Sequence, residues 1–429
     1  MLFTKDLETD MKVIIYEDEY FDNLYPLTYL RPVYELKCGH TKLLQKIHRL
    51  LGEQEYYYFM REYLAPVFSK KYGSDRVNQP SAFEGDVLLI NGRLLAIDIS
   101  IPLNGPEEVA LSQGQIVYCR LRAATIKRLG FSKLNELLQA AVTQLPNKAI
   151  DAKLINYPWN LIQHNSKAIL DDFHHIEQPG IHGELSPQAS IVGDPNLIYI
   201  APGASVRPFV TLDTSHGPII LDRDVIVHPY THIEGPNAIA EQTQVFGGNI
   251  REGCAIGPVC RVRGEIEESI IHGYSNKHHD GFLGHAYVCE WVNLGAFTTN
   301  SDLKNDYTSV QIYIKGELVD SQDLKVGSFI GDHTKTSIGT LFTTGAVVGV
   351  MSNVVHAGSL IPKFVPSFCW FINNHVTKGF GFQHMVNTAA KAMARRKVQL
   401  TPEDEAMLRT VFEMTKEERS YWIKKGFQS

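Results

Sequence analysis

Histidine, amide and carboxylate side chains gather in residues 273–306, where the spacing favours proton-transfer chemistry. Imidazole is well suited to accept a proton from an attacking nucleophile near neutral pH. The flanking glycines would allow a substrate to approach the backbone closely. A lone histidine is more often structural, so the interpretation depends on the whole set. Its polar members are His278, His279, Asp280, His285, Asn293, Asn300 and Asp302.

From about residue 185, aliphatic or small residues recur at every sixth position. This period fits neither an α-helix nor a simple alternating strand. It predicts a left-handed parallel β-helix, a triangular coil of short strands, rather than an antiparallel β domain with chance spacing. Residues 273–306 are expected to interrupt the coil. The runs are Ile200, Val206 and Leu212; Leu221, Val227 and Ile233; Ile250, Ile256 and Val262; and Ile330, Thr336, Phe342, Val348 and Val354.

A zinc site is the alternative interpretation of these histidines, because the γ-class carbonic anhydrases bind zinc on a coil of the same shape. The spacing of His279 and His285, with asparagine and glycine around them, does not match that ligand pattern.

The N-terminal part alternates strand-like and helical segments. Residues 12–16, 56–59 and 87–90 are apolar runs, and residues 43–51 place their leucines on one helical face. We therefore expect an α/β domain over 11–150, a linker helix over 151–180, the β-helix over 181–375 and a helical C-terminal extension over 376–429. We expect that extension to be a solvated packing helix; its functional alternative is a trimer contact or a lid that binds a polyphosphate.

Composition narrows the class of protein. The 429 residues suffice for two or three domains, and the formal charge of −6 argues against nucleic-acid binding over the whole surface. No apolar stretch is long enough for a membrane span, and the first ten residues lack the features of a signal peptide. The six cysteines form no CxxC pair, which favours reduced thiols. We expect a cytoplasmic protein.

Residues 275–302, SNKHHDGFLGHAYVCEWVNLGAFTTNSD, resemble the acetyl-transfer segment of the family of bifunctional N-acetylglucosamine-1-phosphate uridylyltransferase/glucosamine-1-phosphate N-acetyltransferases, in its divergent bacterial form. The resemblance implies that His279 is the catalytic base. Phe282 replaces a family tyrosine, so a hydroxyl contact to the sugar is lost. The sugar phosphate and acceptor would be bound by Arg263, Lys277, Asn293, Asn300 and Asp302.

Residues 23–36, NLYPLTYLRPVYEL, more distantly resemble a conserved stretch of sugar nucleotidyltransferases, which implies a Rossmann-like nucleotidyltransferase fold. The family's glycine-rich phosphate loop is replaced by an acidic loop, and Arg93 stands where the family holds a metal with aspartate. Phosphate binding is then expected from Arg31, Lys37, Asn91 and Arg93, and Mg²⁺ binding from Glu17 and Asp18.

The resemblance implies acetyl-CoA-dependent N-acetylation of an amino-sugar 1-phosphate such as glucosamine-1-phosphate, coupled to nucleotidyl transfer that gives a UDP-sugar such as UDP-N-acetylglucosamine. Mg²⁺ would serve the second reaction. A homotrimer would bind CoA between neighbouring subunits. Two alternatives stay open: an acetyltransferase with a degenerate nucleotidyltransferase domain, and a non-catalytic scaffold that binds sugar nucleotides. Neither a nucleic acid nor a membrane is an expected partner.

Overall fold

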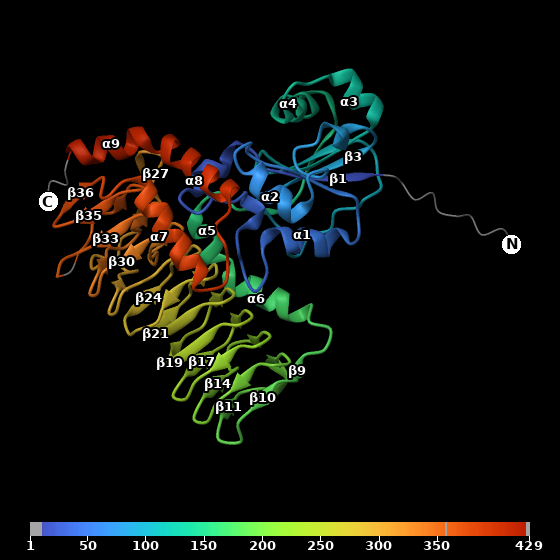
Figure 1. The fold of residues 1–429 in the computed structure, drawn as a ribbon. Helices are drawn as coiled ribbons and strands as arrows, with labels where there is room; N and C mark the ends of the chain where they lie inside the picture. Colours follow the sequence, from blue (N-terminus) through green and yellow to red (C-terminus); the bar gives the residue numbers. More distant parts are fainter. Residues whose placement is uncertain (1–10, 357, 426–429) are drawn as a thin grey trace. The chain divides into compact units, whose positions relative to one another are not determined.

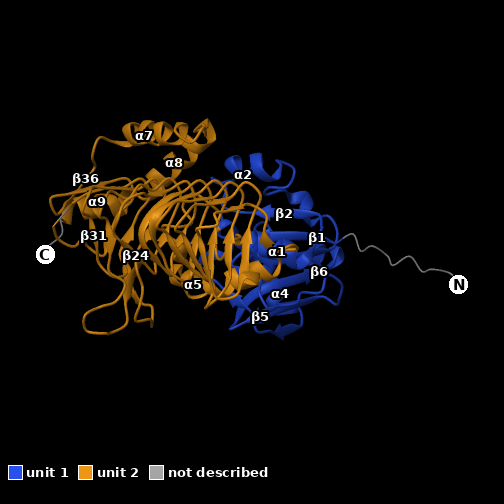
Figure 2. Cartoon of the chain, turned by 90° about the horizontal axis from the view of Figure 1, so that it is seen from below, with its two compact units in different colours: residues 1–21, 32–35, 43–156 blue, residues 22–31, 36–42, 157–429 orange. Residues whose placement is uncertain are grey.

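A computed structural model of the chain describes residues 11–356 and 358–425. The first ten residues, for which the sequence predicts no signal peptide, lie outside the described part. Contacts divide the chain into two compact units (Figure 2). Unit 1 holds residues 1–21, 32–35 and 43–156, and unit 2 holds residues 22–31, 36–42 and 157–429. Two short N-terminal segments therefore belong to the second unit.

Unit 1 is built on a mixed six-stranded sheet with the order β2-β1-β3-β6-β5-β7. The central strand β1 pairs in parallel with β2 and β3, so these three strands end at the same edge of the sheet. The strands are β1 (Lys12–Tyr16), β2 (Tyr56–Phe59), β3 (Val87–Asn91), β5 (Glu108–Ser112), β6 (Gln115–Leu121) and β7 (Asn147–Ala149). The helices are α1 (Leu43–Leu51), α2 (Ala65–Tyr72), α3 (Ala123–Leu129) and α4 (Leu134–Gln144).

Unit 2 is a coil of short parallel strands stacked turn upon turn (Figure 1). One of its faces is a ten-stranded parallel sheet. In stacking order, that face consists of β9 (Gly180–Ile181), β12 (Ile198–Ile200), β15 (Ile219–Leu221), β18 (Asn237–Ile239), β20 (Cys254–Ile256), β22 (Ile270–Ile271), β25 (Tyr287–Val288), β29 (Phe329–Ile330), β32 (Val347–Val348) and β34 (Phe364–Val365).

Shorter strands from the early and later turns form the other faces of the coil. Early turns supply β10 (Glu184–Leu185), β13 (Ser205–Val206), β16 (Ile226–Val227), β11 (Ser190–Val192), β14 (Thr211–Asp213), β17 (His232–Glu234), β19 (Gln244–Ile250), β21 (Arg261–Glu267), β23 (Asn276–Lys277) and β24 (Phe282–Gly284). Later turns supply β26 (Thr299–Asn300), β30 (Lys335–Thr336), β31 (Leu341–Phe342), β33 (Asn353–Val355), β35 (Trp370–Ile372) and β36 (His375–Thr377).

The six-residue period marks the inward side chains. Ile200, Val206 and Leu212 belong to one buried core with Val348 and Val354. Because parallel strands stack these residues in register, each turn covers the apolar side chain of the turn before it. The predicted fold class is confirmed: an α/β domain, a parallel β-helix and a helical C-terminal tail. That tail consists of α7 (Phe382–Ala394), α8 (Pro402–Met414), which Thr401 caps, and α9 (Lys416–Lys425).

Residues 273–306 do not interrupt the coil, which corrects the sequence-based expectation. Strand β21 pairs in parallel with β23 and β24, and β25 pairs with β22 and β29. The period is obscured because two inward positions are polar: Lys277 is in register with Val262, and Asn300 with Phe342. The excursion from the coil comes later, as the antiparallel hairpin of β27 (Gln311–Ile314) and β28 (Glu317–Asp320).

Two helices of unit 2, α5 (Pro158–Gln163) and α6 (Asn165–His174), lie in the segment predicted as a linker helix. Asn165 of α6 accepts a hydrogen bond from the Gly39 amide at 2.7 Å and donates one to the Gly253 carbonyl at 2.7 Å. The helix thus joins the early segment 36–42 to the coil. All six cysteines are free and buried. Within the described residues, no helix is both long and apolar enough to cross a membrane.

Candidate functional site

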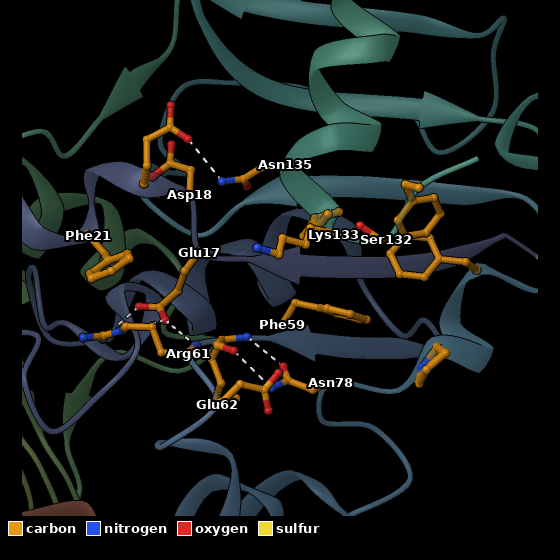
Figure 3. A pocket seen from close by; sticks show the side chains of 16 residues that line it. Glu17, Asp18, Phe21, Phe59, Arg61, Glu62, Asn78, Ser132, Lys133 and Asn135 are labelled. Atoms are coloured by element: carbon orange, nitrogen blue, oxygen red, sulfur yellow. Dashed lines mark hydrogen bonds and ion pairs between the residues drawn. The ribbon is translucent and has the colours of Figure 1, made fainter. Parts of the chain in front are cut away.

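A cavity of about 880 Å³ opens in unit 1 where β1 and β2 end (Figure 3). The loop after β1 contributes Glu17, Asp18 and Glu19, and the loop after β2 contributes Arg61 and Glu62. Lys133 and Asn135 enter from the start of α4, and Phe59, Phe83 and Phe131 supply apolar surface. A cavity at the carboxyl edge of parallel strands is where α/β folds commonly bind ligands.

Each of the two predicted metal-binding carboxylates is held by an arginine. Arg61 donates to Glu17 from Nε and Nη2, both at 3.1 Å, and its own backbone amide donates to the same carboxylate. Arg93, which is fully buried, donates to Asp18 from Nε at 2.8 Å and also from Nη2. Asn91 donates to Asp18 at 2.8 Å. These charge-assisted pairs fix the acidic loop against the sheet.

The residues at this edge do not fit a Mg²⁺ ion. Both Glu17 and Asp18 already accept several hydrogen bonds from cationic or amide donors. Residues 11–356 and 358–425 contain no group of three or more His, Cys, Asp or Glu side chains that could hold a metal. The histidine-rich residues 273–306 lie within these ranges, so they too lack a group of side chains that could hold a zinc ion.

The four predicted phosphate-binding residues fall into two groups. Asn91 and Arg93 lie together on Asp18 in unit 1. Arg31 belongs instead to unit 2, where its buried guanidinium forms a two-pronged pair with Asp332. Lys37 is also in unit 2, buried, and its Nζ donates to the His40 carbonyl. We therefore withdraw Arg31 and Lys37 from the predicted phosphate ligands.

On the coil, the predicted base His279 lies on an exposed corner between β23 and β24. Its ring meets that of His278 edge-on at 5.1 Å, and His278 in turn meets Phe246 at 4.5 Å. Arg263 reaches the same corner, where its Nε donates to Asp280 at 2.9 Å. The structure thus brings together the predicted base and the predicted sugar-phosphate ligand, Arg263.

Three arginines make this corner electropositive. Burial lowers the pKa of His278, and the neighbouring His279, Arg261, Arg263 and Arg396 lower it further because they repel a second positive charge. Burial, and then Arg396, lower the pKa of Arg261, and burial, and then Arg395, lower the pKa of Arg396. Arg396, just after α7, donates to Asn276 at 2.9 Å. Clustered cations beside imidazole groups suit an anionic substrate.

Two other predicted ligands lie inside the coil. Lys277 donates from Nζ to the carbonyls of Arg263 and His279, both at 3.1 Å, and burial lowers its pKa to about 8. Asn300 is buried, and its side chain accepts from the Gly284 amide and donates to the Gly284 carbonyl, both at 2.8 Å. These hydrogen bonds satisfy their polar groups internally, so we withdraw both residues from the ligand set.

The remaining two predicted ligands differ in exposure. Asn293 is exposed and accepts a hydrogen bond from Asn276 at 3.3 Å. Asn276 lies between Asn293 and Arg261 in the stack of parallel strands. Asp302 is largely buried and lies 2.9 Å from His285 Nδ1 at another corner of the coil. Asn293 therefore stays with the electropositive corner, and Asp302 does not.

Sequence reasoning missed Arg261 and Arg396 as members of the site. Arg261 stands two residues before Arg263, so the alternation of a strand could have placed both side chains outward. Arg396 lies 120 residues from its partner Asn276. Its only signal was the modest positive charge of the C-terminal extension.

The family comparison agrees with the two-part architecture. Residues 13–179 match the family described as "Sugar nucleotidyl transferase". The chain thus joins an α/β domain that is similar to sugar nucleotidyl transferases to a parallel β-solenoid.

Its relatives include proteins whose names describe them as bifunctional. A "Bifunctional sugar-1-phosphate nucleotidylyltransferase/acetyltransferase" from Sulfurisphaera tokodaii is 24% identical over 260 residues, which cover 56% of either chain. A "Bifunctional protein GlmU" from Rippkaea orientalis is 27% identical over 31% of this chain and 33% of its own. The chain thus matches about half the length of the first relative and a third of the second. Among solved structures, the UDP-N-acetylglucosamine acyltransferase of Francisella novicida aligns with a TM-score of 0.28, at 13% identity, over 57% of this chain and 87% of that chain.

Proposed function

We propose that the coil transfers an acetyl group from acetyl-CoA to the amine of an amino-sugar 1-phosphate, such as glucosamine-1-phosphate. The observation that carries the proposal is the exposed pair His278 and His279 among Arg261, Arg263 and Arg396. An imidazole can accept the proton that the amine must lose, and the arginines can hold phosphate groups. The names of the relatives support a nucleotidyl and acetyl transfer of this general kind.

In this mechanism the amine nitrogen attacks the thioester carbonyl while His279 takes the amine proton. The carbon–sulfur bond then breaks, and the CoA thiolate leaves with the proton returned to it. No covalent enzyme intermediate is needed. Arg263 would hold the sugar phosphate and Asn293 would orient the acceptor. Arg261 and Arg396 would bind phosphates of acetyl-CoA, because among the described residues their side chains contact carbonyl and amide oxygens and form no ion pair with a carboxylate.

The test is thiol release from acetyl-CoA in the presence of glucosamine-1-phosphate. Replacement of a general base typically costs about 10²–10⁴-fold, so His279→Ala is expected to lose that much turnover. His216→Ala, at another exposed histidine of the coil, is the matched control and should keep the parental rate. Equal turnover in His279→Ala would reject His279 as the base. No turnover with any amino-sugar phosphate would favour a scaffold.

We further propose that unit 1 transfers a nucleotidyl group to the sugar 1-phosphate, giving a UDP-sugar such as UDP-N-acetylglucosamine. The family match over residues 13–179 and the cavity beside β1 and β2 support this second activity. Glu17, Asp18, Glu19 and Glu62 make the cavity acidic, with Arg61 and Lys133 as its lining cations. Pyrophosphate release from UTP and N-acetylglucosamine-1-phosphate is the assay, and its absence over several sugars and nucleotides would leave an acetyltransferase alone.

The proposed assembly is a cytoplasmic homotrimer in which acetyl-CoA lies between neighbouring coils. Light scattering of the full chain should give three times the chain mass. A monomer that still acetylates would separate the assembly from the activity.

A further inference from the structure

A second cavity, of about 490 Å³, lies within unit 2 and is not part of the electropositive corner. We name it the α5 cavity. Trp159 and Ile162 of α5 form one wall, and Ser166 of α6 lies beside them. The coil contributes Glu268 and His285, and the segment after β28 supplies Gln322, Asp323, Leu324, Lys325 and Val326. His285 and His279 flank β24, so the two sites lie at opposite ends of this strand.

His285 lines one side of the α5 cavity, and its ring is oriented by a contact with Asp302. His285 Nδ1 lies 2.9 Å from Asp302 Oδ2, and each side chain is about 15% exposed or less. The imidazole holds the pKa of Asp302 below its usual range, so this carboxylate stays ionised near neutral pH. Because Nδ1 is engaged, Nε2 is the ring nitrogen left for a ligand. The pairing fixes the ring at the wall of the cavity.

The opposite polar group is a carboxylate with few donors. Ser166 Oγ donates to the two carboxylate oxygens of Glu268 at 3.2 and 3.3 Å, and no other residue in 11–356 and 358–425 donates to this carboxylate. Burial raises its pKa. A Cβ at position 253 would lie 2.0 Å from Glu268 Oε2, so Gly253 is what leaves room for this carboxylate. Glu268 is partly buried, and a carboxylate with one weak donor is completed by a cationic partner.

The charge around the cavity is negative. Asp302, Glu268 and Asp323 contribute carboxylates, and Lys325 is the lining cation, itself 3.3 Å from Glu267. A divalent metal does not fit, because the described residues contain no group of three His, Cys, Asp or Glu side chains suited to one. The volume instead matches a small organic molecule.

We propose that the α5 cavity binds a small hydroxylated primary amine, the chemistry of an unphosphorylated amino sugar. The ammonium group would meet Glu268, and hydroxyl groups would meet the amide of Gln322 and Nε2 of His285. Trp159 and Ile162 would cover the apolar face of the ring. The negative surroundings disfavour a sugar phosphate, whereas the arginines of the electropositive corner favour one. The two sites therefore select opposite charges.

The test uses the full chain labelled with 5-fluorotryptophan and fluorine NMR. The chain has four tryptophans, and Trp159→Phe identifies the signal that belongs to the cavity wall. Titration with glucosamine should shift the Trp159 signal in a saturable way. N-acetylglucosamine, which lacks the charge, should bind about tenfold more weakly or not at all, since a charge-assisted hydrogen bond is lost. Glucosamine-1-phosphate should likewise bind more weakly than glucosamine.

Glu268→Gln should lose at least about tenfold in glucosamine affinity, while Glu317→Gln, at an exposed position of β28, should keep the parental affinity. An unmoved Trp159 signal, or equal affinity for glucosamine and N-acetylglucosamine, overturns the proposal. The comparison of the three sugars does not use the Glu268 variant, so it stays decisive even if the Glu268→Gln chain does not fold. Thiol release from acetyl-CoA is scored separately, so failure of the proposed acetyl transfer is distinguishable.

Discussion

Replacement of Lys277 by methionine should change how the stability of the chain depends on pH. Lys277 occupies an inward position of the coil, in register with Val262, and burial lowers its pKa from 10.5 to about 8. The unfolded chain therefore binds more protons than the folded one between these two values. Stability rises with pH across this window and falls as pH drops through the folded pKa.

The size of the effect follows from the two pKa values. A fall from 10.5 to about 8 corresponds to about 3 kcal/mol of penalty for the protonated folded state near pH 7. Most of it, about 2.5 kcal/mol, is relieved near pH 10. Lys277→Met carries no such penalty at any pH. It leaves the carbonyls of Arg263 and His279 without their Nζ donor, at about 1–3 kcal/mol each, but that cost does not depend on pH.

The assay is urea unfolding of the full chain, followed by circular dichroism near pH 7 and near pH 10. The free energy of unfolding of Lys277→Met minus that of the parent should fall by about 2.5 kcal/mol between the two conditions. Other titrating groups cancel in this difference. Lys378→Met removes an exposed lysine and should show no such change. A pH-independent difference for Lys277→Met would refute the reasoning.

Three further predictions concern other parts of unit 2. Arg31→Ala strands the buried Asp332 carboxylate and should lower the free energy of unfolding by about 3–5 kcal/mol; a loss below about 1 kcal/mol would contradict a stabilising pair. Arg396→Ala should raise the KM for acetyl-CoA about tenfold with little change in kcat, whereas a matching fall in kcat would place the residue in the chemical step. Glu418→Gln should be more stable than the parent above about pH 7. Burial raises the pKa of Glu418 to about 7, so the stability that the protonated carboxyl contributes is lost as pH rises through that value. Parallel curves of stability against pH in thermal unfolding would disprove this.

The coil was predictable because its inward positions are mostly apolar and repeat at a fixed spacing. The same reasoning failed at Lys277 and Asn300, which also point inward. Their polar atoms are satisfied by backbone groups of neighbouring turns, such as the Arg263 and Gly284 carbonyls. A search for regularly spaced apolar residues cannot detect an inward position that holds a polar residue. From the sequence, residues 273–306 are therefore predicted to interrupt the coil and to hold ligand-binding side chains.

The electropositive corner was partly predictable. His279 and Arg263 come from motifs that could be matched along the sequence, and the structure places them at one corner of the coil. Arg31 shows the limit of this approach. It belongs to a motif typical of phosphate binding, yet its guanidinium pairs with Asp332, 301 residues away. Nothing local to Arg31 indicates that partner, because the pairing depends on how segment 22–31 packs within unit 2.

The two units alternate along the N-terminal part of the chain, which affects how the gene can be divided by recombination. Segments 22–31 and 36–42 are encoded amid the first unit but pack with the second, through pairs such as Arg31–Asp332 and Gly39–Asn165. A gene fragment that begins at residue 157 would encode a coil with these partners missing. Recombination at the obvious junction would therefore damage both products. The two parts are therefore expected to pass between genomes together.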